Sequence, residues 1–223
     1  MIEVSIIIPC RNEENYIAQC LDSLAAQNYP KERLEVLVVD GLSEDGTRNK
    51  VKPYTKRYPF IKLLDNSSRI IPVAMNIGIK NAKGDVIMKM DAHASYPKDY
   101  VSKCVNALRQ YDADNAGGML ITKPGGDTLQ ARAIALCLSH WFGVGSSPFR
   151  RQSQSKKPRE VDTVAFGCYK KEVFKKIGLY NEHLERSSDM ELNIRLKKAG
   201  GKILLVPDIT AYYYADSTFT QFW

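Results

Sequence analysis

The sequence contains no apolar run long enough to cross a membrane. A spanning helix needs about 18 or more uninterrupted apolar residues, whereas the most apolar stretch, 131–144, is broken by residues such as Arg132 and His140. The first residues, Met1-Ile2-Glu3-Val4, also lack the basic segment and cleavage site of a secretory signal. We therefore expect neither a membrane-spanning segment nor a secretory signal in these 223 residues.

Cysteine is scarce, and its spacing excludes two common uses. The cysteines are odd in number, far apart and free of any C-x-x-C pair: Cys10, Cys20, Cys104, Cys137 and Cys168. A disulfide framework and a zinc motif are therefore not expected. Such cysteines are typical of a reducing compartment, which predicts a cytoplasmic protein in which most of them pack as small apolar residues.

Two widespread phosphate-binding motifs are also missing. No G-x-G-x-x-G follows the first expected strand, and no G-x-x-x-x-G-K-[ST] occurs anywhere. A Rossmann-type dinucleotide domain and a P-loop ATPase therefore lose their main support. If the protein binds a phosphate group, another device must neutralise its charge.

The composition is that of a folded protein with an anionic partner. Hydrophobic residues make up 44% of the chain and charged residues 26%, enough for a sizeable core. Lys and Arg total 32 against 25 Asp and Glu, a net charge of +7. This balance favours a nucleotide, a phospholipid surface or a nucleic acid, and charge alone does not choose among them.

Strand and helix patterns alternate through the first half of the chain. The patterns predict strands at 4–8, 34–39, 60–64, 86–90 and 118–122, and helices at 13–27, 47–58, 72–82 and 97–111. Such alternation is typical of a single α/β domain with a mostly parallel sheet covered on both faces. The second half is less regular, with helices expected at 129–142, 170–177 and 189–199, strands at 202–206 and 210–214, and a flexible loop at 143–160.

Polar, acid-bearing segments follow three of these strands. They are residues 9–13, 40–47 and 91–93. Parallel α/β sheets bind ligands at the carboxyl ends of their strands, so the three segments are expected to meet at one edge. Any one of them alone is better explained as the cap of the next helix. Together they indicate a binding site.

The triplet Asp91-Ala92-His93 is a candidate metal site. Residues two apart on a strand project to the same side, so the carboxylate and the imidazole could share a divalent cation that neutralises a diphosphate. A nitrogen and an oxygen ligand together suit Mn²⁺ better than Mg²⁺. The alternative is a turn carboxylate beside a surface histidine.

A second acidic cluster, 187–191, begins a predicted helix. Ser188 and Glu191 have capping-box spacing, which favours a structural role for Glu191. Asp189 lies in the first turn, where the positive end of the helix favours its ionised form. That form suits a general base, although the spacing alone leaves a structural role equally open.

The basic residues of the expected loop have two interpretations. They are Arg150, Arg151, Lys156, Lys157 and Arg159. A solvated face is the default, and contact with anionic lipid is the functional alternative. No aromatic residues are interleaved for base stacking, so nucleic acid is the weaker candidate.

In order and spacing, these motifs resemble the family 2 glycosyltransferases, which have the GT-A fold. The residues that carry the resemblance are 4–9 with 11–13, 38–43 with 45–47, 74–79, 82–85, 91–93, 143–150, 162–167, 189–196 and 199–201. The segments 143–150 and 162–167 resemble a subgroup related to succinoglycan-type exopolysaccharide synthesis, which also has His at the third position of the metal triplet, where most of the family has an acid.

The resemblance implies a role for each matching residue. Asp91 and His93 would bind the metal, and Asp189 would be the catalytic base. The nucleotide or its sugar would contact Pro9, Arg11, Glu13, Asp40, Ser43, Asn76, Lys89, Asp91 and Gly167. Within that set, Asp40 would lie against the base, and Gly167 would allow a close backbone approach to a sugar.

The activity implied is an inverting transfer of a sugar from a nucleotide-diphosphate donor, with UDP the expected nucleotide. The acceptor would be a hydroxyl of a lipid-linked saccharide or a growing polysaccharide, at the inner face of the membrane. The chain departs from the family at Ala74, where many members have Arg. It also lacks the Q-x-x-R-W motif of the processive synthases. Related chains continue into membrane-associated helices, so we expect the native chain to extend beyond Trp223. The alternatives are a nucleotidyltransferase acting on a sugar phosphate and a non-catalytic nucleotide-sugar-binding module.

Overall fold

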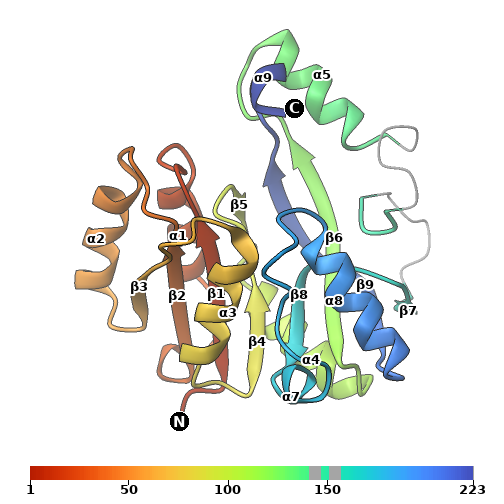
Figure 1. Cartoon of the computed structure of the whole chain (residues 1–223). Helices are drawn as coiled ribbons and strands as arrows, with labels where there is room; N and C mark the ends of the chain where they lie inside the picture. Colours follow the sequence, from red (N-terminus) through yellow and green to blue (C-terminus); the bar gives the residue numbers. More distant parts are fainter. Residues whose placement is uncertain (141–146, 151–156, 223) are drawn as a thin grey trace.

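A computed structural model describes residues 1–140, 147–150 and 157–222. Its centre is one mixed sheet with the strand order β3-β2-β1-β4-β8-β6-β9-β5, and β7 pairs with β9 outside this path. Helices cover both faces of the sheet (Figure 1). The expected α/β architecture, a mostly parallel mixed sheet between helices, is thus confirmed.

The first half of the chain forms the parallel part of the sheet. Its strands are β1 (Val4–Cys10), β2 (Leu34–Asp40), β3 (Ile61–Asp65) and β4 (Val86–Lys89). Every residue of β1 and β2 is buried, as expected for central strands with both faces covered. The connections between them hold α1 (Ile17–Ala25), the 3₁₀ helix η1 (Lys31–Arg33), α2 (Thr47–Arg57) and α3 (Ile71–Asn81).

The second half adds antiparallel pairs. β8 (Ala165–Lys170) runs antiparallel to both β4 and β6 (Asn115–Lys123), whereas β9 (Ile203–Tyr214) is parallel to β6. The short strands β5 (Ala94–Ser95) and β7 (Arg159–Glu160) pair with β9. The helices here are α4 (Tyr100–Gln110), α5 (Leu129–Cys137), α7 (Glu172–Ile177), α8 (Ser188–Lys198) and α9 (Phe219–Phe222).

Alternation along β1 separates two cores. Ile6 and Ile8 belong to the cluster that includes Leu21 of α1 and residues of α4. Ile7 belongs to the other cluster, which contains Met75 of α3 and Leu192 of α8. Successive strand residues point to opposite faces, so this one strand anchors helices on both sides. Figure 1 shows α3, α7 and α8 on the near face.

Two predictions about the second half were wrong. The strands expected at 202–206 and 210–214 form one strand, β9, because the residues between them are accommodated by a shift in register against β6 after Gly117. The helix expected at 129–142 ends at Cys137. Of the loop expected at 143–160, residues 143–146 and 151–156 lie outside the described residues, and Arg159–Glu160 forms β7.

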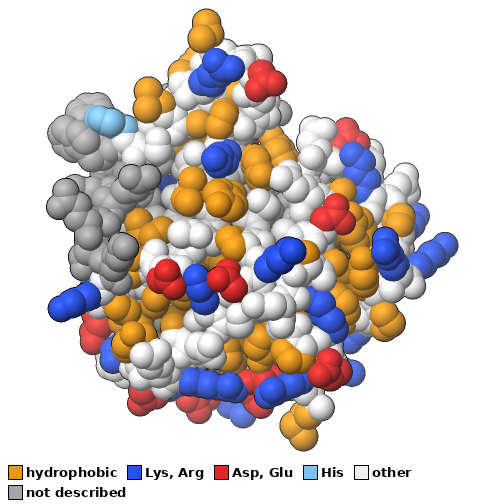
Figure 2. Space-filling view, turned by 180° about the vertical axis from the view of Figure 1, so that it is seen from behind, with side chains coloured by type: hydrophobic (Ala, Val, Ile, Leu, Met, Phe, Trp, Pro, Cys, Tyr) orange, Lys and Arg blue, Asp and Glu red, His pale blue; other side chains and the backbone are white. Residues whose placement is uncertain are grey.

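The far ends of β6 and β9 carry α5 and α9 beyond the rest of the sheet (Figure 1). Leu129, Leu136 and Phe219 of this projection are large apolar residues with exposed side chains, and apolar side chains are visible on it in Figure 2. No helix in the described part of the chain is both long and apolar enough to cross a membrane.

Candidate active site

The loops after β1 and β2 are tied together by hydrogen bonds. The backbone N–H of Asn12 donates to Ser43 Oγ at 2.9 Å, and the Asn12 side chain accepts from the N–H of Glu44 at 2.9 Å. The N–H of Glu13 donates to Thr47 Oγ1 at 2.7 Å. Because β1 and β2 are parallel neighbours with Cys10 opposite Asp40, these contacts join the two loops into one wall.

Asp40 anchors this wall and is not open to a ligand. Its side chain is fully buried and forms an ion pair with Arg48 at 2.7 Å, and Arg48 also pairs with Asp65 at 2.8 Å. Asp40 accepts hydrogen bonds from both the N–H and the hydroxyl of Ser43. The carboxylate of Asp40, which was predicted to lie against the nucleobase, is thus already buried and paired with Arg48. No sequence motif had pointed to Arg48.

A cavity of about 390 Å³, here called the strand-end cavity, lies at the carboxyl ends of β1 and β4. It unites a large part of the predicted site: Pro9, Arg11, Glu13, Lys89, Asp91 and His93. Arg69 also lines it and was not predicted. Arg11 and Arg69 share one carboxylate, Glu44, at 3.9 and 3.3 Å, so the cavity retains positive charge for an anion.

A second cavity of about 260 Å³, here called the Asp189 cavity, adjoins the first. Lys89 and Asp91 line both cavities. In the second they face Asp189 at the start of α8 and Phe166 of β8. Phe166 has φ +50° and Ser187, which also lines this cavity, has φ +60°. Such strained backbone in non-glycine residues is concentrated at functional sites.

Asp189 is fixed by two contacts. Its carboxylate forms an ion pair with Lys89 and accepts a hydrogen bond from the Tyr180 hydroxyl at 3.1 Å. Lys89 Nζ is also 3.9 Å from Asp91. Burial lowers the pKa of Lys89, but the charges of Asp189 and Asp91 outweigh burial and raise it above its usual value. Tyr180 lies in the segment before α8, and no local pattern in the sequence pointed to it.

His93 is oriented by Glu13. His93 Nδ1 is 2.7 Å from Glu13 Oε1, and the imidazole and the Tyr213 ring are packed edge to face, with centroids 5.0 Å apart. Burial lowers the pKa of His93, but the hydrogen bond to Glu13 and the nearby charges of Asp91 and Asp216 raise it to about 9. With Nδ1 bonded to Glu13, Nε2 is the ring nitrogen left for a metal, and it must lose its proton to bind one.

The pair Asp91 and His93 fits a metal that is held jointly with a ligand. In the described part of the chain no cluster of three or more His, Cys, Asp or Glu could hold a metal ion. Asp91 and His93 line the same cavity and supply one oxygen and one nitrogen. Their carboxylate–imidazole chemistry suits Mn²⁺, and phosphate oxygens of a bound nucleotide would complete the coordination, as is common at nucleotide sites.

Asn76 and Gly167, both predicted to contact the donor or a sugar, each have a packing role in the structure. Asn76 is 3% exposed. Its side-chain amide forms hydrogen bonds with the backbone of Tyr180 and with the carboxylate of Glu182, so it joins α3 to the segment before α8. A Cβ on Gly167 would lie 2.4 Å from the Tyr169 ring. The absence of a side chain at Gly167 is therefore explained by the packing of this ring.

Helix α8 begins in a different way from the prediction. Its first residue is Ser188, its N-cap is Ser187, and no side-chain capping bond forms. Glu191 pairs with Arg195 one turn further along, at 2.5 Å. Glu191 is structural, as predicted, but through this ion pair. Asp189 lies in the first turn, as expected.

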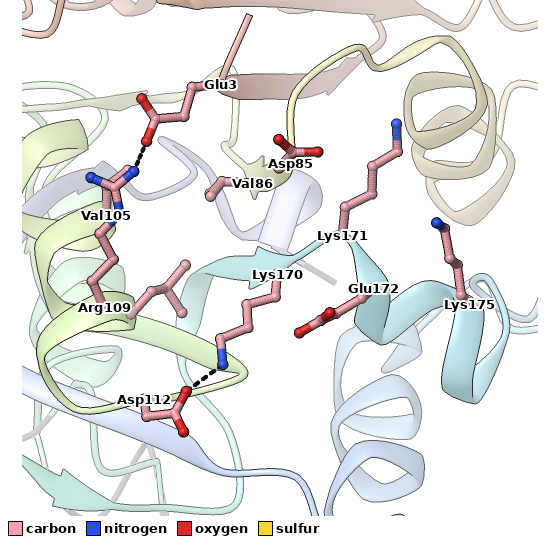
Figure 3. Close-up of a pocket in the computed structure, with 11 residues that line it drawn as sticks. Glu3, Asp85, Val86, Val105, Arg109, Asp112, Lys170, Lys171, Glu172 and Lys175 are labelled. Carbon is pink, nitrogen blue, oxygen red and sulfur yellow. Dashed lines mark hydrogen bonds and ion pairs between the residues drawn. The ribbon is translucent and has the colours of Figure 1, made fainter.

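A larger cavity of about 610 Å³ lies at the opposite ends of the strands, beside the starts of β1 and β4. Figure 3 shows two ion pairs among its charged side chains, Arg109 with Glu3 and Lys170 with Asp112. Arg109 pairs with Glu3, Lys170 pairs with Asp112 at 2.6 Å, and Lys171 donates to the carbonyl of Ala82 at 2.7 Å. Figure 2 likewise shows basic and acidic side chains mixed along this lower edge. These internal pairings make it a weaker ligand site than the two cavities at the strand ends.

The fold is that of the GT-A class. The chain matches the family described as glycosyl transferase family 2 over residues 5–178. It therefore belongs to glycosyltransferase family 2.

Two relatives match almost the whole chain. One, from Methanococcus voltae, is "Dolichyl N-acetyl-alpha-D-glucosaminyl phosphate 3-beta-D-2,3-diacetamido-2,3-dideoxy-beta-D-glucuronosyltransferase"; the identity is 33%, and the match covers 98% of this chain and 69% of that protein. The other is the succinoglycan biosynthesis protein ExoA of Rhizobium meliloti, at 30% identity over 94% of this chain and 62% of that protein.

Solved structures share the fold. Staphylococcus aureus TarS 1–349 in complex with UDP-GlcNAc has a TM-score of 0.76 at 21% identity, covering 96% of this chain and 59% of that one. The mannosyltransferase PcManGT from Pyrobaculum calidifontis, in complex with GDP-Man and Mn²⁺, has a TM-score of 0.76 at 21% identity, covering 99% and 59%.

Proposed function

We propose that this protein transfers a sugar, with inversion, from a nucleotide-diphosphate donor to a hydroxyl of its acceptor, and that Asp189 is the catalytic base. The observation that carries the proposal is the pair of adjoining cavities, which share Lys89 and Asp91. A donor in the strand-end cavity and an acceptor in the Asp189 cavity would meet at these two residues. Membership of glycosyltransferase family 2 supports the same reaction.

The strand-end cavity is suited to the donor. Arg11 and Arg69 have only Glu44 as a shared carboxylate partner in the ion pairs described, so they can also bind phosphate oxygens. Asp91 and His93 would hold the divalent metal, which we propose to be Mn²⁺. When bound, that metal would neutralise the diphosphate as it leaves. Pyrobaculum calidifontis PcManGT binds Mn²⁺ with GDP-Man in its structure, which supports the assignment.

Asp189 is suited to remove the proton of the acceptor hydroxyl. Lys89 and Tyr180 hold its carboxylate in place from two directions, and a base fixed within reach of the nucleophile is what general base catalysis requires. Inversion needs one base and no covalent intermediate, which agrees with a single carboxylate on the acceptor side. Lys89 also screens Asp189 from the like charge of Asp91.

For the acceptor we propose a lipid-linked saccharide or a growing polysaccharide. The relative from Methanococcus voltae is named for a dolichyl phosphate-linked sugar, and the relative from Rhizobium meliloti for succinoglycan biosynthesis. Either acceptor agrees with a protein that works in the cytoplasm at the inner face of the membrane. UDP is the nucleotide that we propose for the donor, and Staphylococcus aureus TarS was solved with UDP-GlcNAc.

The first experiment separates binding from chemistry. Asp189→Asn should lower transfer by about 100-fold or more while leaving Mn²⁺-dependent nucleotide binding intact. Glu191→Gln is the matched control, because it removes a carboxylate two residues away on the same helix that pairs with Arg195 instead of facing the cavity. An Asp189→Asn enzyme with normal turnover would exclude Asp189 as the base.

The second experiment identifies the donor and tests the metal ligands. Thermal shifts with UDP-, GDP-, CDP- and dTDP-sugars in Mn²⁺ should select one nucleotide, and Asp91→Ala should weaken its binding by about tenfold or more. Unchanged affinity would refute the role of Asp91. Release of free pyrophosphate when the protein is given a nucleoside triphosphate and a sugar phosphate would instead indicate a nucleotidyltransferase.

A further inference from the structure

The lining of the Asp189 cavity combines apolar walls with one distinctive cation. Leu120, Phe149 and Met190 form part of its lining. Lys89 forms an ion pair with each of the two carboxylates of the lining, Asp91 and Asp189. The remaining charged group of the lining is the guanidinium of Arg150.

Arg150 is held in place without a carboxylate. Its Nη1 donates to Thr122 Oγ1 at 3.2 Å, and its guanidinium stacks on the Tyr213 ring, 4.9 Å from the centroid. The preceding residue is fixed to β6, because the N–H of Leu120 donates to the carbonyl of Phe149 at 2.8 Å. Among the described residues no carboxylate lies within ion-pair distance of Arg150. Burial lowers its pKa, as expected for a cation partly removed from water.

Arg150 forms no ion pair among the described residues, although the charge of Asp91 acts on it from outside ion-pair distance, so its guanidinium can still bind an anion. Arginine presents several N–H donors in a plane that matches the oxygens of a phosphate. Desolvation of this guanidinium is unfavourable unless an anionic group compensates for it. Since the cavity also contains the proposed base, the anion that Arg150 binds would lie on the acceptor side.

The rim of the cavity is apolar. Met190 lines the cavity and its side chain is 53% exposed. Ile194 lies one turn further along α8 and is 46% exposed, and residues four apart on a helix share a face. A ligand that leaves the cavity past Met190 would therefore lie against an apolar stripe.

We propose that Arg150 binds the phosphate of an acceptor in which a sugar is joined through that phosphate to an apolar chain. The sugar would lie near Asp189, and the chain would leave the cavity along Met190 and Ile194. This inference rests on the proposed function and narrows it, because it selects a phosphate-linked lipid acceptor over a neutral polysaccharide.

The test uses citronellyl phosphate, a short branched alkyl phosphate, as the probe. Its affinity for the protein loaded with Mn²⁺ and UDP is measured by titration calorimetry, together with the affinities of citronellol and inorganic phosphate. We expect citronellyl phosphate to bind at least tenfold more tightly than either fragment. Arg150→Gln should lower its affinity about tenfold, and Met190→Ser should weaken it without changing the affinity for inorganic phosphate.

Two further variants control for charge and folding. Lys123→Gln is matched to Arg150→Gln, because Lys123 also stacks on a tyrosine, Tyr212, with Nζ 5.5 Å from the ring centroid, but lies outside the cavity lining. It should leave the affinity for citronellyl phosphate unchanged. Arg150→Lys keeps the positive charge and should give an intermediate affinity, and the melting temperature of each variant reports its folding.

The outcomes separate the sources of phosphate. If Arg150→Gln weakens UDP binding and leaves citronellyl phosphate unaffected, Arg150 serves the donor diphosphate, and the inference is wrong. It is also wrong if the wild-type protein binds citronellyl phosphate no better than citronellol. If no nucleoside diphosphate binds in Mn²⁺ but citronellyl phosphate binds through Arg150, the proposed function fails and the phosphate site remains.

Discussion

Replacing Asn76 with alanine tests whether Asn76 contacts the nucleotide-sugar donor or instead holds α3 against the segment before α8. In the structure its Nδ2 donates to the Tyr180 carbonyl at 2.9 Å and to Glu182 Oε1 at 2.8 Å, and its Oδ1 accepts from the Tyr180 N–H at 2.9 Å. A hydrogen bond contributes about 1 kcal/mol to stability. The loss of three such bonds should lower the free energy of unfolding by about 3 kcal/mol.

The same substitution should also disturb Asp189, the proposed base. The backbone that Asn76 holds belongs to Tyr180, whose hydroxyl donates to Asp189 at 3.1 Å. If Tyr180 moves, Asp189 loses one of the two contacts that fix it. We therefore expect Asn76→Ala to lower kcat while the affinity for the nucleotide stays within about twofold of wild type, since small positional errors in a catalytic group reduce rates strongly.

The assay is thermal unfolding followed by circular dichroism, combined with nucleotide titration in Mn²⁺. For a protein of this size a loss of about 3 kcal/mol corresponds to a fall in Tm of roughly 6–12 °C. Asn81→Ala is the matched control on the same helix, because the exposed Asn81 makes a single bond to the carbonyl of Ile77. A nucleotide affinity reduced tenfold at an unchanged Tm would refute the clamp and restore Asn76 as a donor contact.

Three more predictions concern single side chains. Glu13→Gln should weaken Mn²⁺ binding in the nucleotide complex by about tenfold, because His93 loses its charged partner. Electron paramagnetic resonance measures the Mn²⁺ affinity, and an unchanged affinity would contradict the role of the Glu13–His93 contact. Gly167→Ala should lower Tm while nucleotide affinity is retained, because its Cβ would meet the Tyr169 ring; a normal Tm with weaker nucleotide binding would favour a sugar contact. Burial alone would raise the pKa of Glu35, but the hydrogen bonds it accepts lower it below 4.5. Glu35 should therefore stabilise the protein at neutral pH and lose this effect as the pH falls below about 4.5, so the Tm difference between wild type and Glu35→Gln should shrink in acid.

The parts of the site that the sequence predicted lie at strand ends. Asp91 and His93 could be placed on one side of a cavity because residues two apart on a strand project together, and Asp189 because it begins a marked helix. The cavity does bring Asp91, His93 and the residues after β1 together. The placement of Asp91 and His93 needed only local spacing and the rule that parallel strands end at one edge, whereas the role of Asp189 came from the resemblance to family 2 glycosyltransferases.

Contacts between residues that are far apart along the chain could not be predicted from the sequence. Tyr180 reaches Asp189 from an irregular segment, and Arg48 pairs with Asp40 from the next helix, so neither interaction follows a periodic pattern. Asn76 was placed in the donor site by resemblance to a motif, but its partners are the backbone and side chain of a segment more than 100 positions away. Local propensity carries no information about such pairings.

The position of β4 in the sheet explains why the two cavities adjoin. β4 pairs with β1 in parallel and with β8 antiparallel, so it is the strand at which the sheet changes direction. The parallel side brings the loops that line the strand-end cavity, and the antiparallel side brings Phe166 at the start of β8 together with Asp189 of α8. Lys89 ends β4 and Asp91 follows it, so both lie where the two halves meet and belong to both cavities. In α/β sheets a change in strand order is where ligands bind, and here the change in strand direction adds a second cavity beside the first.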